Sequence, residues 1–365
     1  MAHIAIDARI ISTTTGRYVE RLLHYLEQID RSNHYTVLVR EKDKDYWKPT
    51  NPNFTVKIAD FKNYTFSEQT GFLKLLNSLD ADLVHFCQPE QPVLYKGKKV
   101  TTIHDLTLLK TYNSDKNWLI YHFKQLVGRF VFHRVINTSR AVITPTNFTK
   151  NEIINFFKAN PEKFTTTHLA AGARTTSKKA YTLPSKNFIM FVGQQSDYKN
   201  VRRLTDAHHQ LLKKHNDLEL VLVGKIDSTA KRTQQYINSK GYTHITFTGF
   251  VEDDELNWLY SNAKAYIFPS LMEGFGLPGL EAMNHSLAVV SSNTTCLPEV
   301  YEDAAHYFDP LNVNDMARAI NEVISDDKLR NTLIKNGSYQ VKKYSWEETA
   351  KRTHQVYLRA LAVEN

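Results

Sequence analysis

The sequence predicts an α/β fold made of two doubly wound, Rossmann-like domains that face each other across a cleft. The chain has 365 residues, which is too long for one ordinary hydrophobic core. Short β-branched or aliphatic runs alternate with amphipathic segments in which apolar residues recur every three or four positions. This alternation lapses once, near residues 171–187, and then starts again. Each half therefore indicates a parallel sheet with helices on both faces.

In the first half, the predicted strands are short runs typical of a buried sheet. They read HIAIDA, YTVLVR, FTVKIA, DLVHF, KVTTIHD and AVITPT. The segments RYVERLLHYLEQI and QTGFLKLLNSL between them have helical spacing of apolar residues. We therefore expect an N-terminal domain over residues 1–170.

The stretch AAGARTTSKKAYTLPSKN is small, polar and basic, and predicts an interdomain linker over 171–187. Beyond it, strands are predicted at FIMFVG, LELVLVG, ITFTGF, AYIFPS and AVVSSN, which gives a second domain over 188–343. Residues 344–365 should form a final helix, because Ser345 suits an N-cap and Glu347 and Glu348 follow in the first turn.

Composition limits the class of protein. The two cysteines, Cys87 and Cys296, are far apart and outside any CxxC motif, so we expect no disulfide framework, no zinc site and a reducing compartment. The N-terminal stretch MAHIAIDARI does not resemble a secretory signal, and no apolar run is long enough to cross a membrane. We expect a cytoplasmic protein. Its net charge of +8 favours anionic partners such as nucleic acid, an acidic membrane or phosphorylated substrates.

The stretch YIFPSLMEGFGLPGLEAM places carboxylates on both sides of a glycine-rich bend, where a strand gives way to a helix. Gly274 and Gly276 let backbone N–H groups approach a ligand, and Pro278 suits the first turn of a helix. Backbone donors and a helix start can hold an anion, while Glu273 and Glu281 accept from hydroxyls. A nucleotide sugar is a ligand that carries both a phosphate and several hydroxyls. The alternative is a tight turn with acids that stabilise the helix start by about 0.3–1 kcal/mol.

The sequence around this bend resembles the retaining GT-B glycosyltransferases of family 4, which carry an E-x7-E signature. Glu273 and Glu281 have that spacing. The resemblance covers nearly the whole C-terminal half, through GFVEDDELNWLYSNAKAYIFPS, SSNTTCLPEV, FDPLNVNDMARAI and YSWEETA. It continues more weakly through TGRYVERLL, TIHDLTLL and VITPTNFTKNEI in the N-terminal half. In style it is similar to mannosyltransferase-like enzymes of bacterial polysaccharide assembly.

The resemblance implies a GT-B architecture and a role for each matching residue. Glu273 would contact donor-sugar hydroxyls and His104, in TIHD, would lie near the reacting sugar, which makes these two the catalytic candidates. Glu281 would accept from the ribose hydroxyls and Lys199 would bind the diphosphate. The full set of donor-binding candidates is Gly16, Lys199, Phe275, Gly276, Leu277 and Glu281.

Several of these residues also have a structural interpretation. Lys199 could be a solvated lysine at a helix start, His104 a structural histidine at a strand end, and Gly16 a helix start. The family often has an arginine where this chain has Gln194. Arg202 or Arg203 could substitute for it.

The resemblance also implies metal independence, retention of configuration and front-face attack. The DxD-like triplets at 43–45 and 80–82 are unconvincing metal motifs, so we expect no metal and no cofactor beyond the donor substrate. GDP-mannose is the favoured donor, with UDP-glucose or UDP-GlcNAc as the alternative. The acceptor would be a saccharide or a lipid-linked saccharide.

Residues 116–140 contain no acidic residue and interleave cations with aromatic side chains. Such a helix could lie on an anionic membrane or grip a lipid-linked diphosphate, and each cation near the surface would add about 1 kcal/mol. Alternatively, its aromatic residues pack inside the N-terminal domain. Two further classes are a nucleic-acid-binding protein and a non-catalytic glycan- or nucleotide-sugar-binding protein. No nucleic-acid motif accompanies the basic stretch, so no nucleic acid is expected.

Overall fold

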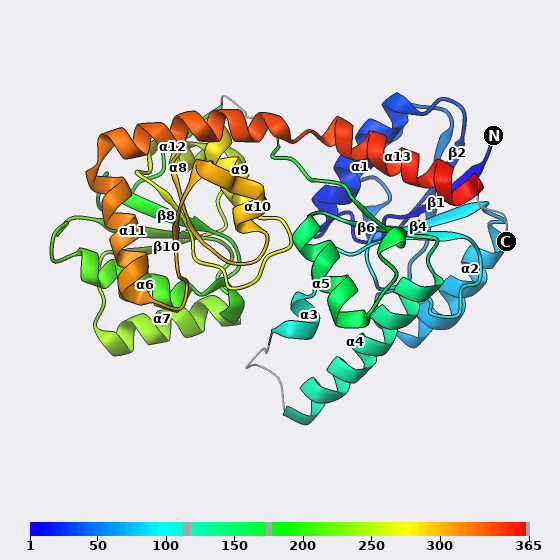
Figure 1. Cartoon of the computed structure of the whole chain (residues 1–365), viewed down its shortest axis with the longest axis horizontal. Helices are drawn as coiled ribbons and strands as arrows, with labels where there is room; N and C mark the ends of the chain where they lie inside the picture. Colours follow the sequence, from blue (N-terminus) through cyan, green and yellow to red (C-terminus); the bar gives the residue numbers. More distant parts are fainter. Residues whose placement is uncertain (112–117, 173–176, 363–365) are drawn as a thin grey trace. The chain divides into compact units, whose positions relative to one another are not determined.

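The computed structural model describes residues 1–111, 118–172 and 177–362 (Figure 1). The described residues form two compact units. The first comprises Met1–Leu109, Trp118–Leu169 and the chain from Ser345 onward, and the second comprises Ala170–Tyr344 together with the described residues Lys110 and Thr111. Residues 116–117 of the predicted basic segment and 173–176 of the predicted linker lie outside the described residues.

The first unit is built on a seven-stranded sheet with the order β3-β2-β1-β4-β5-β6-β7. Neighbouring strands are parallel throughout. The strands are β1 (His3–Asp7), β2 (His34–Val39), β3 (Phe54–Ile58), β4 (Leu83–Phe86), β5 (Lys99–Thr102), β6 (Ala141–Thr144) and β7 (Phe164–Thr166). The helices are α1 (Gly16–Ile29), η1 (Glu41–Asp43), η2 (Glu68–Phe72), α2 (Leu73–Ser78), α3 (Thr107–Lys110), α4 (Trp118–Thr138), α5 (Asn147–Phe157), η3 (Pro161–Lys163) and α13 (Trp346–Ala362).

The strands of this unit have apolar sequences because helices cover both faces of the sheet. All four residues of β4 are buried, as is typical of strands covered on both faces. Phe72 and Leu76 of η2 and α2 pack with residues of β1, β2 and β4. Ile136 of α4 and Ile153 of α5 pack with Val142 of β6 in a second cluster.

The final helix, α13, belongs to this first unit. It packs along α1, as the red and blue ribbons in Figure 1 show. The hydroxyl of Tyr357 lies 2.6 Å from Nδ1 of His85, and both side chains are fully buried. The helix begins as its sequence predicts, because Ser345 Oγ accepts from the backbone N–H of Glu348.

The second unit has a six-stranded parallel sheet with the order β10-β9-β8-β11-β12-β13. Its strands are β8 (Phe188–Val192), β9 (Glu219–Val223), β10 (Ile245–Gly249), β11 (Tyr266–Phe268), β12 (Val289–Ser292) and β13 (Ala305–Phe308). Its helices are η4 (Asp197–Lys199), α6 (Val201–Leu211), α7 (Ser228–Lys240), α8 (Asp253–Asn262), α9 (Leu277–Asn284), α10 (Leu297–Tyr301), η5 (Glu302–Ala304), α11 (Val313–Ser325), α12 (Asp327–Gln340) and η6 (Val341–Lys343).

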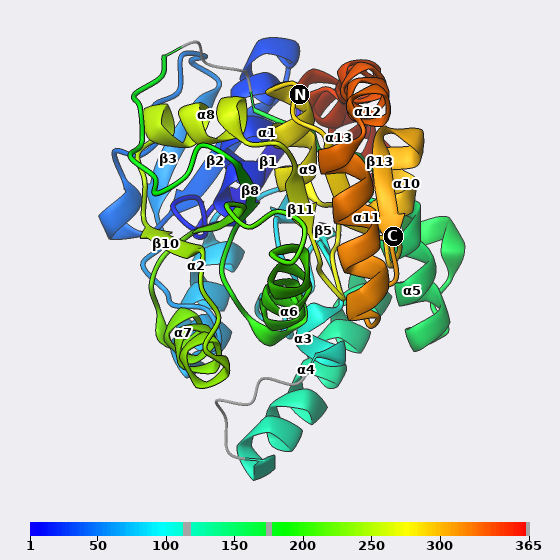
Figure 2. The same cartoon turned by 90° about the vertical axis from the view of Figure 1, so that its left-hand side faces the viewer.

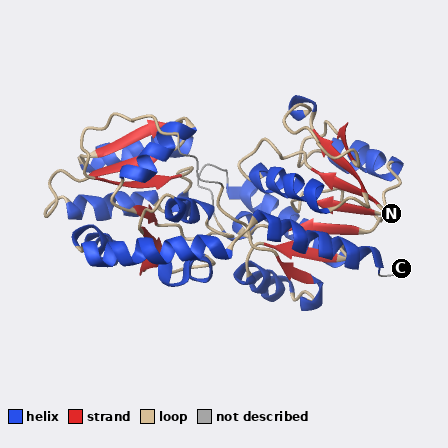
Figure 3. Cartoon of the chain, turned by 90° about the horizontal axis from the view of Figure 1, so that it is seen from above, coloured by secondary structure: helices blue, strands red, loops and turns tan. Residues whose placement is uncertain are grey.

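The main core of the second unit lies between the sheet and the helices α6 and α11. Leu204 and Ile320 from these helices pack on Ile189 and Ile267 of the central strands. Figure 2 shows the two helices side by side, and Figure 3 shows the strands of each unit with helices on both sides. The predicted class, two parallel-sheet Rossmann-like domains, is therefore confirmed.

Residues 177–179 of the predicted linker lie against α8 of the second unit. The backbone N–H of Lys179 donates to the carbonyl of Asp254 at 3.1 Å, and its ammonium pairs with Glu255. The amide of Asn257 donates to the carbonyl of Ser177. These contacts attach residues 177–179 to the second unit.

Candidate functional site

Two loops meet at the carboxyl edge of the second sheet. Because β8 and β11 are parallel neighbours, the chain leaves both strands at the same edge, where open α/β sheets bind ligands. The loop after β8 contains η4, and the loop after β11 runs from Pro269 to Gly276. The backbone N–H of Leu271 donates to the carbonyl of Tyr198 at 2.7 Å. This bond holds the two loops together.

Lys199 and Glu273 form an ion pair between these loops. Lys199 Nζ lies 2.6 Å from Glu273 Oε1, and the two side chains are only 16% and 13% exposed. The ammonium group also lies 5.6 Å from the centre of the Phe268 ring. The structure therefore brings together the two residues that the sequence predicts for diphosphate and sugar.

Glu281 lies in the first two turns of α9, next to the same site. The helix starts after Gly276, which has a left-handed backbone with φ 94°, and Pro278 lies in its first turn as predicted. Burial, and then the negative charges of Glu273 and Glu281, raise the pKa of the Tyr266 hydroxyl. Both predicted carboxylates thus act on one buried group of β11.

Tyr301, which the sequence does not single out, shapes the glycine-rich bend. Its hydroxyl donates to the carbonyl of Gly276. A Cβ atom would lie 2.5 Å from that hydroxyl oxygen at Gly276 and 2.2 Å from it at Gly279. Both positions therefore require glycine for packing against Tyr301, in addition to any approach of a ligand.

The predicted contribution of Phe275 can come only from its backbone. Its side chain is 4% exposed and contacts the ring of Tyr344 edge-on at 5.5 Å. The neighbouring Leu277 is the first residue of α9, so its N–H belongs to the helix N-terminus.

Gly16 and His104 lie in the first unit and are connected through Tyr18. Gly16 begins α1, and a Cβ there would lie 2.1 Å from the carbonyl oxygen of Ile11. The Tyr18 ring contacts the His104 ring edge-on at 4.9 Å. The close approach of Ile11 alone requires a glycine at position 16, whether or not a ligand binds there.

The protonation of His104 follows from its partner. Its Nε2 lies 3.0 Å from the carbonyl oxygen of Cys87, and a carbonyl can only accept, so Nε2 carries the hydrogen. Burial lowers the pKa of His104, although the charge of Asp105 and the bond to Cys87 act to raise it. A neutral ring of this tautomer has Nδ1 as its hydrogen-bond acceptor.

Comparison with known proteins identifies the family. Residues 15–170 match Glycosyltransferase Family 4, and residues 173–340 match Glycosyl transferases group 1. O-antigen chain mannosyltransferase B of Escherichia coli is 30% identical over 277 residues, which cover 71% of this chain and 70% of that protein. The chain belongs to the GT-B, family 4-like glycosyltransferases.

A second relative agrees with this assignment, and a solved structure agrees with the fold alone. A serotype-specific mannosyltransferase of Escherichia coli is 31% identical over 277 residues, which cover 72% of this chain but only 34% of that longer protein. Sucrose-phosphate synthase from Thermosynechococcus elongatus matches the fold with a TM-score of 0.78 at 17% identity, over 100% of both chains.

In this glycosyltransferase, Gln194 stands at the position where the resemblance leads one to expect an arginine, and its side chain is hydrogen-bonded to Asp227. Its amide donates to Asp227 Oδ2 at 2.9 Å. Of the two candidate substitutes, Arg202 lies against the Tyr236 ring at 5.8 Å. Arg203 instead donates to the side chain of Asn200 at 2.8 Å, directly after the Lys199 turn. Arg203 is therefore the better placed of the two cations.

The two DxD-like triplets, at 43–45 and 80–82, lie in separate parts of the first unit. Residues 80–82 precede β4, so they lie at the amino edge of the first sheet, and Asp82 accepts from the backbone N–H of His3 at 2.7 Å. Asp43 lies in η1 beside Lys42. Within residues 1–111, 118–172 and 177–362, no group of three or more His, Cys, Asp or Glu side chains is arranged to hold a metal ion.

Proposed function

We propose that this glycosyltransferase moves mannose from GDP-mannose to a saccharide or lipid-linked acceptor, with retention of configuration, in bacterial surface polysaccharide synthesis. The observation that carries the proposal is the Lys199–Glu273 ion pair, beside the bend that leads into α9. It puts a cation and a carboxylate next to a helix N-terminus, which suits a diphosphate joined to a sugar. The choice of mannose follows the names of the relatives, which are mannosyltransferases of bacterial O-antigen.

In this mechanism, the second unit holds the donor. The Lys199 ammonium leaves Glu273 and compensates the charge that develops on the departing diphosphate. Glu273 then accepts from hydroxyls of the sugar, and Glu281 accepts from the ribose. The N–H groups at the start of α9 add further positive potential.

The transfer step breaks the bond between the anomeric carbon and the diphosphate oxygen. The acceptor hydroxyl oxygen forms the new bond on the same face, and its proton passes to the leaving phosphate oxygen. His104 contributes as a neutral group whose Nδ1 accepts from a sugar hydroxyl. Metal independence is supported by the position of Asp80 and Asp82 at the opposite edge of the first sheet from His104.

Thermal shifts test the donor. GDP-mannose, UDP-glucose, UDP-GlcNAc, GDP and UDP are added with EDTA to the wild type, to Glu281→Ala and to a control, Glu347→Ala, on the exposed side of α13. A ligand at 100 times its dissociation constant adds about 2.7 kcal/mol of stability. We expect a GDP-selective shift that Glu281→Ala loses and the control keeps. A UDP-selective shift would overturn the mannose assignment, and no shift at all would overturn the donor site.

The product tests the stereochemistry. Proton NMR of the first glycoside formed should show the same anomeric configuration as the donor. Activity should persist in EDTA. An inverted product or loss of activity with EDTA would contradict the proposed mechanism.

We further propose that the enzyme works at the cytoplasmic face of an anionic membrane, which α4 contacts. The described part of α4 has a buried side, with Phe132 and Ile136, and an exposed side, with Leu126, Val127 and Phe130 at 65%, 45% and 61% exposure. The buried side agrees with aromatic residues that pack inside the N-terminal domain, and the exposed apolar side supports the proposed membrane contact. None of the described helices is both long and apolar enough to cross a bilayer.

A further inference from the structure

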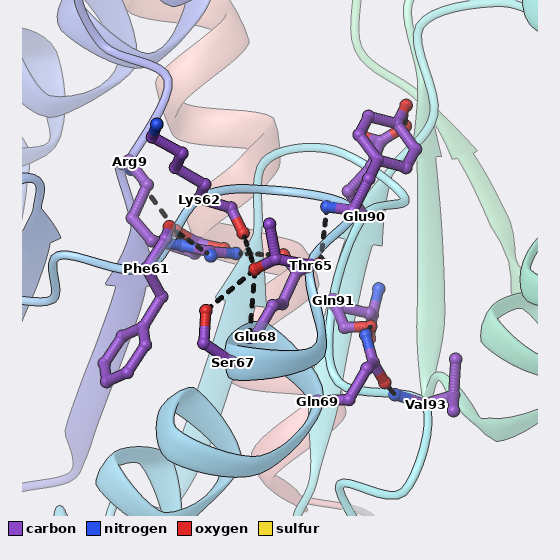
Figure 4. Close-up of polar contacts among 12 residues, drawn as sticks. Arg9, Phe61, Lys62, Thr65, Ser67, Glu68, Gln69, Glu90, Gln91 and Val93 are labelled. Atoms are coloured by element: carbon purple, nitrogen blue, oxygen red, sulfur yellow. Dashed lines mark hydrogen bonds and ion pairs between the residues drawn. The ribbon is translucent and has the colours of Figure 1, made fainter.

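A buried ionic cluster fixes one loop at the carboxyl edge of the first sheet. Arg9, which follows β1, donates from Nε and Nη2 to both carboxylate oxygens of Asp7, each at 2.8 Å. It also binds Glu68 Oε1 at 2.9 Å and the carbonyl of Phe61 at 3.0 Å. The three charged residues are at most 2% exposed, and Figure 4 shows Arg9 reaching Phe61 and Glu68. Breaking such a cluster would leave an uncompensated charge in the protein interior, which is strongly destabilising. The cluster therefore fixes the position of the loop.

This cluster holds Tyr64 in an unfavourable backbone conformation. Tyr64 has φ 61°, in the left-handed region that residues other than glycine seldom adopt. Its backbone N–H donates to the second oxygen of Glu68 at 2.9 Å. The side chain is left 73% exposed, and its hydroxyl donates to Glu90, in the loop that follows β4.

Phe66, two residues further along, is 82% exposed. Tyr64 and Phe66 are the two most exposed aromatic side chains that the structure describes in the first unit. Large aromatic side chains are enriched at interaction surfaces, so two exposed ones within three residues, on a loop attached to buried ion pairs, favour a binding role. Gln69 also connects to the loop after β4. Its side-chain amide donates to the carbonyl of Gln91 and accepts from the N–H of Val93 (Figure 4).

This combination suits a sugar. A pyranose ring has C–H faces that stack on the negative face of an aromatic ring, and hydroxyls that donate to a carboxylate. A carboxylate has about four acceptor positions, so Glu90 retains acceptor capacity beyond its bond to Tyr64. The Glu90 carboxylate beside Tyr64 disfavours an anionic lipid surface at this place.

We propose that Tyr64, Phe66 and Glu90 form a saccharide-binding site for the acceptor, a mannoside. The inference rests on the proposed function for the choice of mannose. The site lies at the edge of the first sheet where β1, β3 and β4 end, which is where a parallel sheet presents its ligand-binding loops. Tyr64 and Phe66 supply stacking surfaces, and Glu90 orients the hydroxyls.

The test measures binding of α-1,2-, α-1,3- and α-1,6-linked mannobiose to the full chain by calorimetry and saturation-transfer NMR, with GDP present to occupy the donor site. We expect the wild type to bind at least one of them. Tyr64→Ala and Phe66→Ala should each raise the dissociation constant about three- to tenfold. Tyr64→Phe, which keeps the ring, should stay within about twofold. Tyr339→Ala, which removes an exposed aromatic residue of α12, is the matched control.

The outcomes separate this site from the donor assignment. All variants should keep the wild-type thermal shift with GDP-mannose. Absence of mannobiose binding by a wild type that still responds to GDP-mannose would overturn the acceptor site alone. Unchanged binding in Phe66→Ala, a residue with no side-chain hydrogen bond to lose, would also overturn it. Mannobiose binding that depends on Phe66, without any response to GDP-mannose, would support the site and overturn the donor.

Discussion

Lys199 and Glu273, which lie 74 positions apart in the chain, are joined by a 2.6 Å contact between Nζ and Oε1. Both side chains are largely shielded from water, so their mutual attraction is screened less than that of a surface salt bridge. The pair holds each charged group in place for its proposed ligand. A bound donor has to supply both with new partners, a diphosphate for the lysine and sugar hydroxyls for the glutamate.

Lys199→Met should weaken GDP-mannose binding about 10- to 100-fold, because a hydrogen bond to a charged group contributes roughly 1.5–3 kcal/mol. The measurement is calorimetric titration with GDP-mannose and, separately, with GDP. The second titration gives the contribution of the nucleotide diphosphate without the sugar. Lys214→Met, at an exposed lysine just after α6, should bind both like the wild type. Equal affinity in Lys199→Met and wild type would remove Lys199 from the donor site.

Most strands could be predicted because they are buried on both faces and read as short apolar runs. The sequence pattern does not predict β7 or β13, and each is the last strand of its sheet. β7 has only three residues, FTT, and β13, AHYF, has two half-buried residues in the middle. Neither shows the continuous apolar run on which the prediction depends.

The site could be predicted residue by residue but not as an arrangement. The resemblance points to Lys199 and Glu273 separately. Their contact depends on β8 and β11 being neighbours, and two other strands lie between these in sequence. Tyr301 carries no sequence signal, since its contact with the bend is created only by folding.

Gly279→Ala tests the packing of the bend against Tyr301. The new methyl group would lie 2.2 Å from the Tyr301 hydroxyl oxygen and 2.4 Å from Cζ. We expect a loss of about 1–3 kcal/mol in the free energy of unfolding, measured by urea denaturation, because overpacking forces a shift of the ring or the helix. Gly172→Ala is the control, since nothing lies within 4 Å of a Cβ at that position.

A double-mutant cycle locates the cause of this loss. Tyr301→Phe removes the atom nearest to the new methyl group, so Gly279→Ala should cost less in that background. Strict additivity of the two substitutions would show that the cost of Gly279→Ala does not arise from the tyrosine hydroxyl.

His208 should make the protein less stable as the pH falls. It is fully buried in the second unit with Nε2 against the carbonyl of Leu218, and burial lowers its pKa to about 4. The unfolded chain takes up this proton near pH 6.5, before the folded chain does. The stability that depends on neutral His208 is thus complete above about pH 6.5 and is lost as pH falls towards 4, by up to about 1.4 kcal/mol per pH unit.

The measurement is the free energy of unfolding in urea between pH 7 and pH 4. His208→Gln keeps an N–H donor for Leu218 but does not titrate, so its stability should fall less steeply than that of the wild type. His34→Gln, at an exposed position at the start of β2, controls for the loss of a histidine. A slope in His208→Gln equal to that of the wild type would show that His208 does not titrate on unfolding in this range.

Vesicle binding tests the membrane face of α4. Phe130 stands at the centre of the exposed side, with Leu126 and Val127 beside it and with the exposed cations Arg129 and Arg134 on its two flanks. We expect Leu126→Ser with Phe130→Ser to reduce cosedimentation with phosphatidylglycerol vesicles. Replacing Arg129 and Arg134 with glutamine should weaken binding about fivefold for each cation and reduce its dependence on salt.

Leu358→Ser, which changes a half-exposed apolar residue of α13, should bind vesicles like the wild type and serves as the matched control. Neutral phosphatidylcholine vesicles separate the two contributions, because only the apolar side chains act on them. Binding that is equal on neutral and anionic vesicles would leave the arginines without a role. If the serine variants also bind like the wild type, α4 does not contact the membrane, and its exposed side must serve another partner.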